Sequence, residues 1–315
     1  MKNVFLVAFA FATVALGACN QEDDIQNVAP SGPYASLAAA LNENTALAQT
    51  YNIDADSGGS FVATRGTRFL FPKRAFLTPG GDTVQGTVQV TIREYLDRGE
   101  MIFSRVLPVS GTMPLLTAGE FFTSAVQSGK TVQLRLSKPY TVFLPQRNFI
   151  TPASGLGPFL GVIQEIPGSG INWIPSGYPA SIIASDIDTV ATTADTLGFY
   201  QPAVANEFFN YQGQDAATVK FSMGGVGGLD DANSFLFVLP KGLREVIPIG
   251  GAKAIGKLPF VGRKDVEVNV VAIAVVNGYF YGGTSTAKIE DGKTLNVDLK
   301  EYPPSIFKAA ITALL

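Results

Sequence analysis

Short apolar runs that alternate with polar residues constrain this chain more than any other feature. Val88, Val90 and Ile92 are separated by single polar residues, which predicts a strand with one buried and one solvated face. The same alternation returns at 132–136, after a glycine turn. Because such runs recur about every ten residues over 61–145, this part of the chain is predicted to form a sandwich or a barrel.

Strand-forming runs continue in the second half of the chain. They are 182–183, 219–221, 235–239, 266–276 and 295–299. Val270 to Val276 is almost wholly apolar, so we expect this strand to be covered on both faces. We therefore predict an all-β fold, with two β-sandwich-like domains in tandem, a short N-terminal helix and a short C-terminal helix.

The two helices are predicted from spacing and capping. The run 36–49 is rich in helix formers, and Ser36 is its expected N-cap. Pro304 suits the start of a second helix over 305–315. The apolar stripe expected on this second helix is Ile306, Ala309, Ala310, Ala313 and Leu314.

The two halves share one local pattern. Gly119 to Leu136 and Gly278 to Leu299 both predict a strand, a turn and a returning strand. Ordinary hairpin chemistry explains the similarity, and a duplication is the alternative left open.

The N-terminus resembles a bacterial lipoprotein signal. Lys2 precedes an apolar run, Val4 to Ala15, which has the length of a signal-peptide core and is too short to span a membrane. The sequence Leu16-Gly17-Ala18-Cys19 resembles the lipobox, and Cys19 is the only cysteine. This resemblance implies that 1–18 is a signal peptide and that the mature chain starts at a lipidated Cys19 anchored in a membrane.

Residues 19–33 are predicted to be an acidic, polar tether. The cluster Asn20-Gln21-Glu22-Asp23-Asp24 resembles the surface-export signal of lipoproteins of the Bacteroidota. The resemblance implies an outer-membrane protein displayed on the cell surface. The periplasmic face of the outer membrane is the alternative.

The predicted domain division follows composition. A helix and the first sandwich occupy 34–150, and a connection rich in glycine and proline occupies 151–180. The second β domain, with the C-terminal helix, is expected over 181–315.

The first sandwich resembles the ZU5-like domain of Bacteroidota envelope proteins. The matching segments are Ser57-Gly58-Gly59, Arg65-Gly66-Thr67, Phe71-Pro72, Ala75-Phe76, Gly81 and the valine-rich strand Val84 to Glu94. The resemblance covers roughly 57–145 and implies a β-sandwich with an interaction role and no catalytic residues. Related lipoproteins place a Trp-Ile-Asn-Cys-Asp-like signature before a second β domain, whereas Phe208 to Tyr211 here lacks both Trp and Cys.

Composition excludes several kinds of chemistry. The chain has no histidine, so mechanisms that need an imidazole are ruled out, and a single cysteine rules out intrachain disulfides and Cys-rich metal sites. With 23 basic and 26 acidic residues, it has no excess positive charge to bind nucleic acid. We expect no cofactor. A calcium ion at the loop from Asp54 to Gly58, or near Asp230, is the alternative left open.

The expected function is non-enzymatic: a lipid-anchored protein that presents an interaction surface to a protein or a glycan. The candidate ligand-stacking aromatics are Trp173, Tyr178 and Tyr211, and core packing is the other interpretation of these rings. One alternative is a structural part of an envelope complex. Another is a carbohydrate-active enzyme that uses paired carboxylates, with candidates Glu94, Glu100, Glu120, Glu165 and Glu207.

Overall fold

The structure is a computed structural model that describes residues 32–146, 149, 155–166, 168–176, 182–185, 188–206, 211–257 and 259–314. In these residues the fold is all-β, with a short helix near each end and a third between them, which confirms the predicted fold class. The predicted signal peptide, with Leu16, Gly17, Ala18 and the lipidated Cys19, lies outside the described residues, as does most of the tether.

The first β unit holds two sheets. The larger sheet has the order β1-β5-β8-β15-β11-β12, with β7 beside β15 and β6 beside β7. Its strands are β1 (Gln49–Asp54), β5 (Thr87–Tyr95), β6 (Val109–Ser110), β7 (Met113–Thr117), β8 (Glu120–Gln127), β11 (Gly157–Ile166), β12 (Ser169–Pro175) and β15 (Gly198–Ala205). The smaller sheet has the order β13-β14-β10-β3-β2, and β4 pairs with β9 alone. These strands are β2 (Gly59–Val62), β3 (Arg68–Phe71), β4 (Phe76–Leu77), β9 (Arg135–Leu136), β10 (Tyr140–Pro145), β13 (Ile182–Ser185) and β14 (Thr189–Ala194).

The core of the first unit confirms the alternation in the sequence. Val88, Val90 and Ile92 of β5 are fully buried, and they share a core with Phe69 and Phe71 of β3. β5 pairs antiparallel with β1 on one side and with β8 on the other. One face of the larger sheet is therefore packed on the smaller sheet, as in a sandwich.

The strand pairing differs from the predicted division at 151–180. β11 and β12 lie inside this expected connection, and they extend the larger sheet of the first unit through β15. β13 and β14 pair with β10 of the smaller sheet. The first unit therefore continues to Ala205, and the boundary between the two units lies between Ala205 and Ala216. Composition hid these strands because β11 contains Pro158 and two glycines, residues that usually mark turns.

The second β unit also holds two sheets. One has the order β19-β16-β22 and the other has the order β18-β17-β20-β21-β23. The strands are β16 (Ala216–Gly224), β17 (Ser234–Pro240), β18 (Ile247–Gly250), β19 (Phe260–Arg263), β20 (Glu267–Val276), β21 (Tyr279–Lys288), β22 (Thr294–Asp298) and β23 (Lys300–Glu301). β22 pairs in parallel with β16, so the strand expected to return against β21 joins the opposite sheet.

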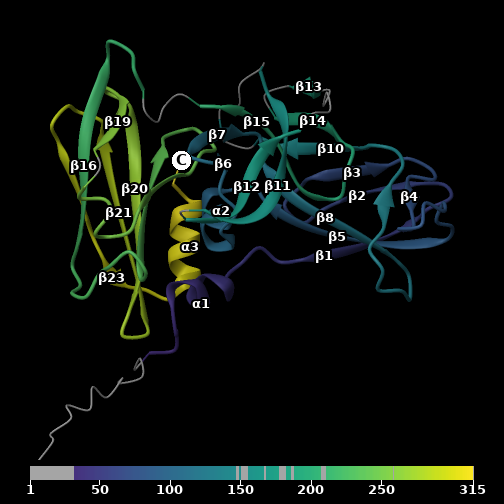
Figure 1. Ribbon diagram of the computed structural model, residues 1–315, viewed down its shortest axis with the longest axis horizontal. Helices are drawn as coiled ribbons and strands as arrows, with labels where there is room; N and C mark the ends of the chain where they lie inside the picture. The colour runs from purple at the N-terminus through teal and green to yellow at the C-terminus, as the bar shows by residue number, and fades with distance from the viewer. Residues whose placement is uncertain are drawn as a thin grey trace, which may run out of the picture.

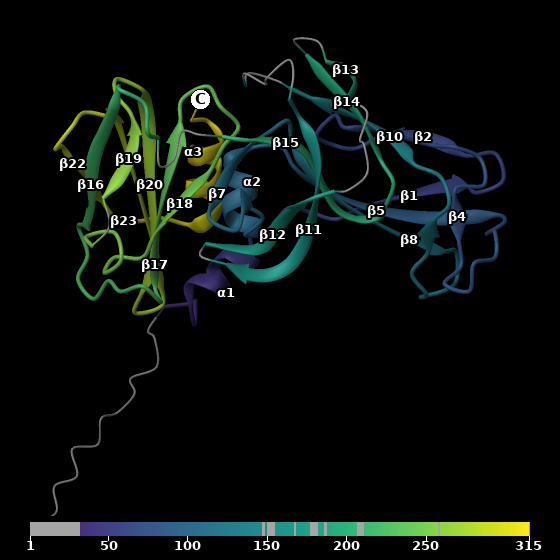
Figure 2. The same cartoon turned by 45° about the horizontal axis from the view of Figure 1, so that its top comes forward.

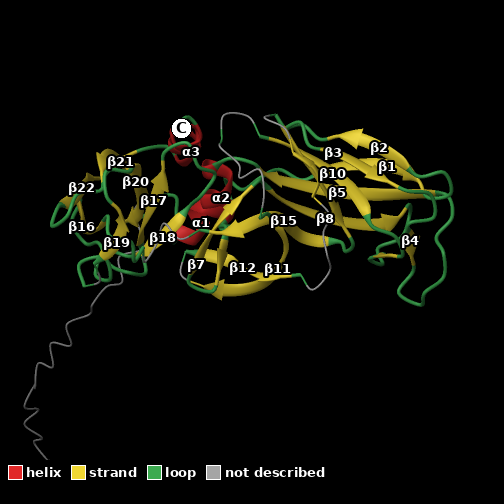
Figure 3. Cartoon of the chain, turned by 90° about the horizontal axis from the view of Figure 1, so that it is seen from above, coloured by secondary structure: helices red, strands yellow, loops and turns green. Residues whose placement is uncertain are grey.

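β20 is buried on both faces, as its apolar sequence predicts. Val270 and Ala272 point into the core of the second unit. Val271 and Ile273 point the other way, into a cluster around the three helices. In Figures 1, 2 and 3 the helices lie between the two β units.

The helices are α1 (Leu37–Asn42), α2 (Arg98–Ser104) and α3 (Pro304–Thr312). Ser36 is the N-cap of α1, and its hydroxyl accepts the Ala39 N–H at 3.1 Å, as predicted. This helix is shorter than expected because the chain turns after Asn42 and enters β1 at Gln49.

The predicted apolar stripe of the C-terminal helix is wrong except at Leu314, which packs against the cluster around the helices. Ile306 is 59% exposed, whereas Phe307 and Ile311 form the buried face of α3. Phe307 lies over Gly282 of β21, where a Cβ would come within 2.6 Å of the ring. Burying the phenyl ring of Phe307 removes more apolar surface from water than burying the alanines of the expected stripe, which favours the face that carries Phe307.

We expect Phe307→Ala to lower the free energy of unfolding by about 3–4 kcal/mol, because it leaves a cavity between α3 and β21. The neighbouring Ile306→Ala should change it by less than about 0.5 kcal/mol. Urea denaturation followed by circular dichroism measures both. Equal effects of the two substitutions would contradict this packing.

Candidate functional site

A groove lies on the face of the larger sheet that is turned toward the helices. Its volume is about 430 Å³. The floor is formed by Tyr95 of β5, Phe122 of β8 and Phe199 of β15, and Arg93 and Arg105 line its sides. This combination of apolar rings with a few charged groups is typical of a ligand site.

Strand register brings the floor residues together. Arg93 lies opposite Phe122 across β5 and β8, and Phe122 lies opposite Phe199 across β8 and β15. The Phe122 and Phe199 rings are 4.8 Å apart between centroids, and Tyr95 stacks on Phe199 at 6.2 Å. Residues far apart in sequence therefore form one cross-strand row.

Gly161 of β11 allows the floor to close. A Cβ at this position would lie 2.5 Å from the Phe199 Cβ and 2.8 Å from Ile171. Without a side chain there, Phe199 lies directly across β11, with Trp173 of β12 at its edge. Backbone close approach is a usual reason for glycine inside a strand.

The structure corrects the prediction that Trp173 stacks on a ligand. Its side chain is fully buried, and its Nε1–H donates to the Leu107 carbonyl at 2.8 Å. The ring meets Phe199 edge-on at 6.4 Å and therefore supports the floor from within the core. Core packing, the other interpretation in the sequence analysis, is correct for this residue.

Of the other two predicted rings, one is described, and it does not line the groove. Tyr178 lies outside the described residues. Tyr211 precedes β16 of the second unit, and its hydroxyl donates to the Asp215 carboxylate. Sequence reasoning did not single out Phe122, Phe199, Arg93 or Arg105, which line the groove.

The two arginines give the groove a positive charge. Arg93 Nη1 donates to the Ala46 carbonyl at 3.3 Å. Arg105 ends α2 in a left-handed conformation, with φ of 54°, and its guanidinium pairs with Glu165 of β11. Among the described lining residues there is no aspartate or glutamate, and the Glu165 carboxylate at the edge of the groove is the acidic group that a bound anion would have to displace from Arg105.

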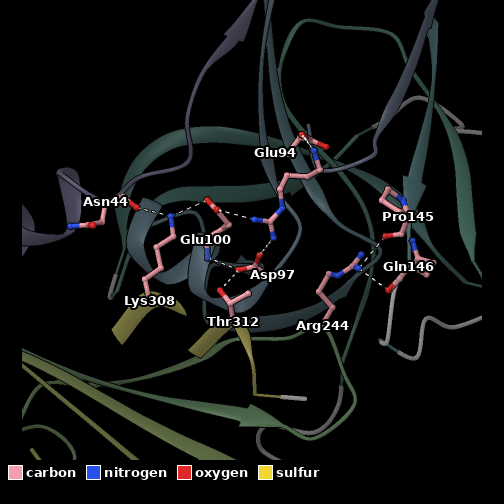
Figure 4. A network of polar contacts seen from close by, with 10 residues as sticks. Asn44, Glu94, Asp97, Glu100, Pro145, Gln146, Arg244, Lys308 and Thr312 are labelled. Carbon is pink, nitrogen blue, oxygen red and sulfur yellow. Dashed lines mark hydrogen bonds and ion pairs between the residues drawn. The ribbon is translucent and has the colours of Figure 1, made fainter. Parts of the chain in front are cut away.

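A second polar region joins the two β units. The loop between β17 and β18 inserts Arg244 and Glu245, both fully buried, against the first unit. Arg244 donates to the carbonyls of Pro145, at 3.2 Å, and Gln146, at 2.9 Å (Figure 4). On the same side, Arg98 of α2 donates to the Leu243 carbonyl at 2.7 Å. Backbone carbonyls thus accept hydrogen bonds from two buried guanidinium groups at this junction.

Two buried carboxyl groups accompany these arginines. Burial raises the pKa of Glu245 to about 8, although a hydrogen bond from Asn206 and the charge of Arg98 oppose the shift. Burial also raises the pKa of Glu120 well above its ordinary value, against the attraction of Arg244. Glu120 accepts no hydrogen bond from any described residue. Its neutral form is therefore favoured.

A third network ties α3 to α2. Arg65 pairs with Asp97 and Glu100, and Lys308 of α3 pairs with Glu100 at 3.3 Å (Figure 4). The Thr312 hydroxyl donates to Asp97 at 2.9 Å. These contacts fix the position of α2, whose C-terminal end forms one side of the groove.

The structure does not bring the four described candidate glycosidase carboxylates together in a cleft. Glu94 accepts backbone N–H groups of Arg65 and Thr67, at 2.9 and 3.1 Å. Glu100 belongs to the α2–α3 network, Glu120 is fully buried, and Glu165 is exposed. Glu207 lies outside the described residues.

The acidic loops considered for calcium form turns. The Asp54 carboxylate accepts the Asp56 N–H at 3.0 Å and the Ser57 hydroxyl at 2.9 Å. Asp230 accepts the N–H groups of Ala232 and Asn233 at 2.9 Å. Among the described residues, no three aspartate, glutamate, cysteine or histidine side chains gather closely enough to hold a metal ion.

Comparison with protein-family models gives no match, and comparison with curated proteins finds no similar sequence. In the part of the chain that the structure describes, no helix has both the length and the apolar character needed to span a bilayer. The residues that line the groove are therefore the basis for proposing a function.

We expect the free energy of unfolding to fall by about 3 kcal/mol between pH 5 and pH 8, because folded Glu245 keeps its proton up to about pH 8 whereas the unfolded chain loses it near pH 4.5. The sign follows from proton binding, since the folded state holds more protons than the unfolded state in this range. Glu245→Gln should remove the part of the slope that Glu245 contributes and leave the part due to Glu120, whose pKa burial also raises. Urea denaturation at several pH values measures the slope.

The surface substitution Glu290→Gln is the control for this prediction. The Glu290 side chain is about half exposed and pairs only with Lys293 among the described residues. Glu290→Gln should therefore leave the slope of the unfolding free energy against pH as it is in the unsubstituted protein. A slope that Glu245→Gln leaves unchanged would contradict the raised pKa of Glu245.

Proposed function

We propose that this chain is a non-enzymatic, lipid-anchored outer-membrane protein that presents its groove to a protein or glycan partner. The groove is the observation on which the binding role depends. Its floor lies on paired strands, and its sides include the end of α2, which is fixed by ion pairs. Side chains held in this way lose little freedom when a ligand binds.

The lipid anchor is proposed from the sequence Leu16 to Cys19, and the start of the described chain is compatible with it. The Gly32 N–H donates to the Asn277 carbonyl at 3.0 Å, at the turn between β20 and β21. The 13 residues that follow Cys19 up to and including Gly32 can span at most about 45 Å. A lipidated Cys19 would thus hold the second unit close to a membrane.

The first sandwich is proposed to be ZU5-like. This part of the proposal rests on the resemblance over 57–145, which implies an interaction role. Of the residues that match, Phe71, Ala75 and Phe76 are fully buried, so they explain the sandwich core and leave the groove as a separate feature.

Protease treatment of intact cells that express the full chain tests this proposal. We expect the protein to be cleaved on intact cells and to remain in the outer-membrane fraction, because two or three acyl chains anchor a protein stably. Cys19→Ala should abolish labelling with a radioactive fatty acid and release the chain from that fraction. Immunoblotting of the fractions measures both results.

Cells with a permeabilised outer membrane are the control. Protection on intact cells followed by cleavage after permeabilisation would contradict surface display and leave the periplasmic face of the outer membrane. Fatty-acid labelling that persists in the Cys19→Ala chain would overturn the anchor itself.

A further inference from the structure

We infer that the groove binds an acidic oligosaccharide, a chain of sugar rings with carboxylate or sulfate groups. Phe122 and Phe199 would contact the sugar rings, and Arg93 and Arg105 would contact the acidic groups. The inference rests on the proposed function, since it names the ligand class of the same groove.

The charges in the groove favour an anion. Arg93 and Arg105 both line it, and no described acidic side chain does. Arg93 has no carboxylate within ion-pair distance among the described residues, and only one of its guanidinium nitrogens donates a hydrogen bond to a described residue. A planar guanidinium with free N–H groups is suited to a carboxylate or a sulfate, which accepts two parallel hydrogen bonds.

The floor favours a ligand with apolar ring faces. Phe122 and Phe199 are half-buried, so part of each ring is open to the groove. Sugar rings present C–H groups on one face and hydroxyl groups at their edges. Asn42, Thr45 and Ser104 line the same groove and offer hydrogen bonds to such hydroxyl groups.

The position of the groove disfavours an extended peptide. It lies on the face of the larger sheet, where β5, β8, β15 and β11 are paired with one another. Their backbone N–H and C=O groups are engaged in these ladders, whereas a bound peptide strand needs a free sheet edge. At the groove the terminal strand, β12, is covered by the end of α2, because the Gly170 N–H donates to the Arg105 carbonyl at 2.8 Å. Recognition in the groove therefore depends on side chains, as expected for a glycan.

One ion pair competes with the ligand. Arg105 pairs with Glu165, whose side chain is 75% exposed. An exposed ion pair is weak, so an acidic ligand can displace the Glu165 carboxylate at low cost. Removing that carboxylate should therefore strengthen binding, which is an effect that damage to the fold would not produce.

The test is calorimetric titration of the full chain in detergent with a panel of carboxylated and sulfated oligosaccharides. Each is compared with its methyl-esterified or desulfated form, and an oligoglutamate peptide is included. We expect at least one acidic sugar to bind at least about tenfold more tightly than its neutral form, with an affinity that falls as salt is added.

Substitutions assign this binding to the groove. Arg93→Gln and Arg105→Gln should each weaken it about tenfold, whereas Arg135→Gln on β9 should leave it unchanged. Glu165→Gln should strengthen it about threefold. Glu267→Gln is the matched control, because it removes the same charge from an exposed ion pair with Lys241 in the second unit.

The inference would be overturned if no acidic sugar bound, or if the acidic and neutral forms bound equally well. It would also be overturned if Arg93→Gln and Arg105→Gln left the affinity unchanged. Binding of the peptide alone would also overturn it and leave a protein partner for the groove. The protease and fatty-acid experiments do not depend on the ligand, so a failure of the proposed anchoring and display remains distinguishable from a failure here.

Discussion

Val271, Ile273 and Val275 alternate along the face of β20 that turns away from the second sandwich, and the arrangement of the whole molecule depends on covering them. A strand that is apolar on both faces needs two partners. The first is the core of the second unit, and the second is the cluster around α1, α2 and α3, which includes Trp173 of the first unit. The two units thus share one apolar cluster.

Buried arginines give this apolar contact a defined orientation. Hydrophobic burial has no preferred direction, whereas Arg244 must reach the Pro145 and Gln146 carbonyls, and Arg98 must reach Leu243. A rotation of one unit would leave these guanidinium groups buried without partners, at a cost of several kcal/mol. Because Arg98 begins α2 and Arg105 ends it, the same contacts help to place one side of the groove.

Local patterns were sufficient to predict the strands with a clear period, but not β11 and β12, and not which strands pair. The alternation at Val88 to Ile92 and the apolar run of β20 are periodic signals that act within one strand. The α2 helix lacks such a period, yet Asp97 followed by Glu100 is a capping signal that could have indicated it, and Asp97 does accept the Glu100 N–H at 2.9 Å. The groove was missed because β8 and β15, which bring Phe122 to Phe199, pair across more than seventy residues without any local signature.

The attachment of the N-terminal segment at Asn277 has a mechanical consequence. The backbone runs on from this point through α1 into β1 of the first unit, and two hydrogen bonds hold it at the β20–β21 turn, from Gly32 to Asn277 and from Tyr34 to Gly278. A pull on the N-terminal segment would therefore open these two bonds one after the other and then load α1 and β1, while the ten paired positions of β20 and β21 stay outside the path of the force.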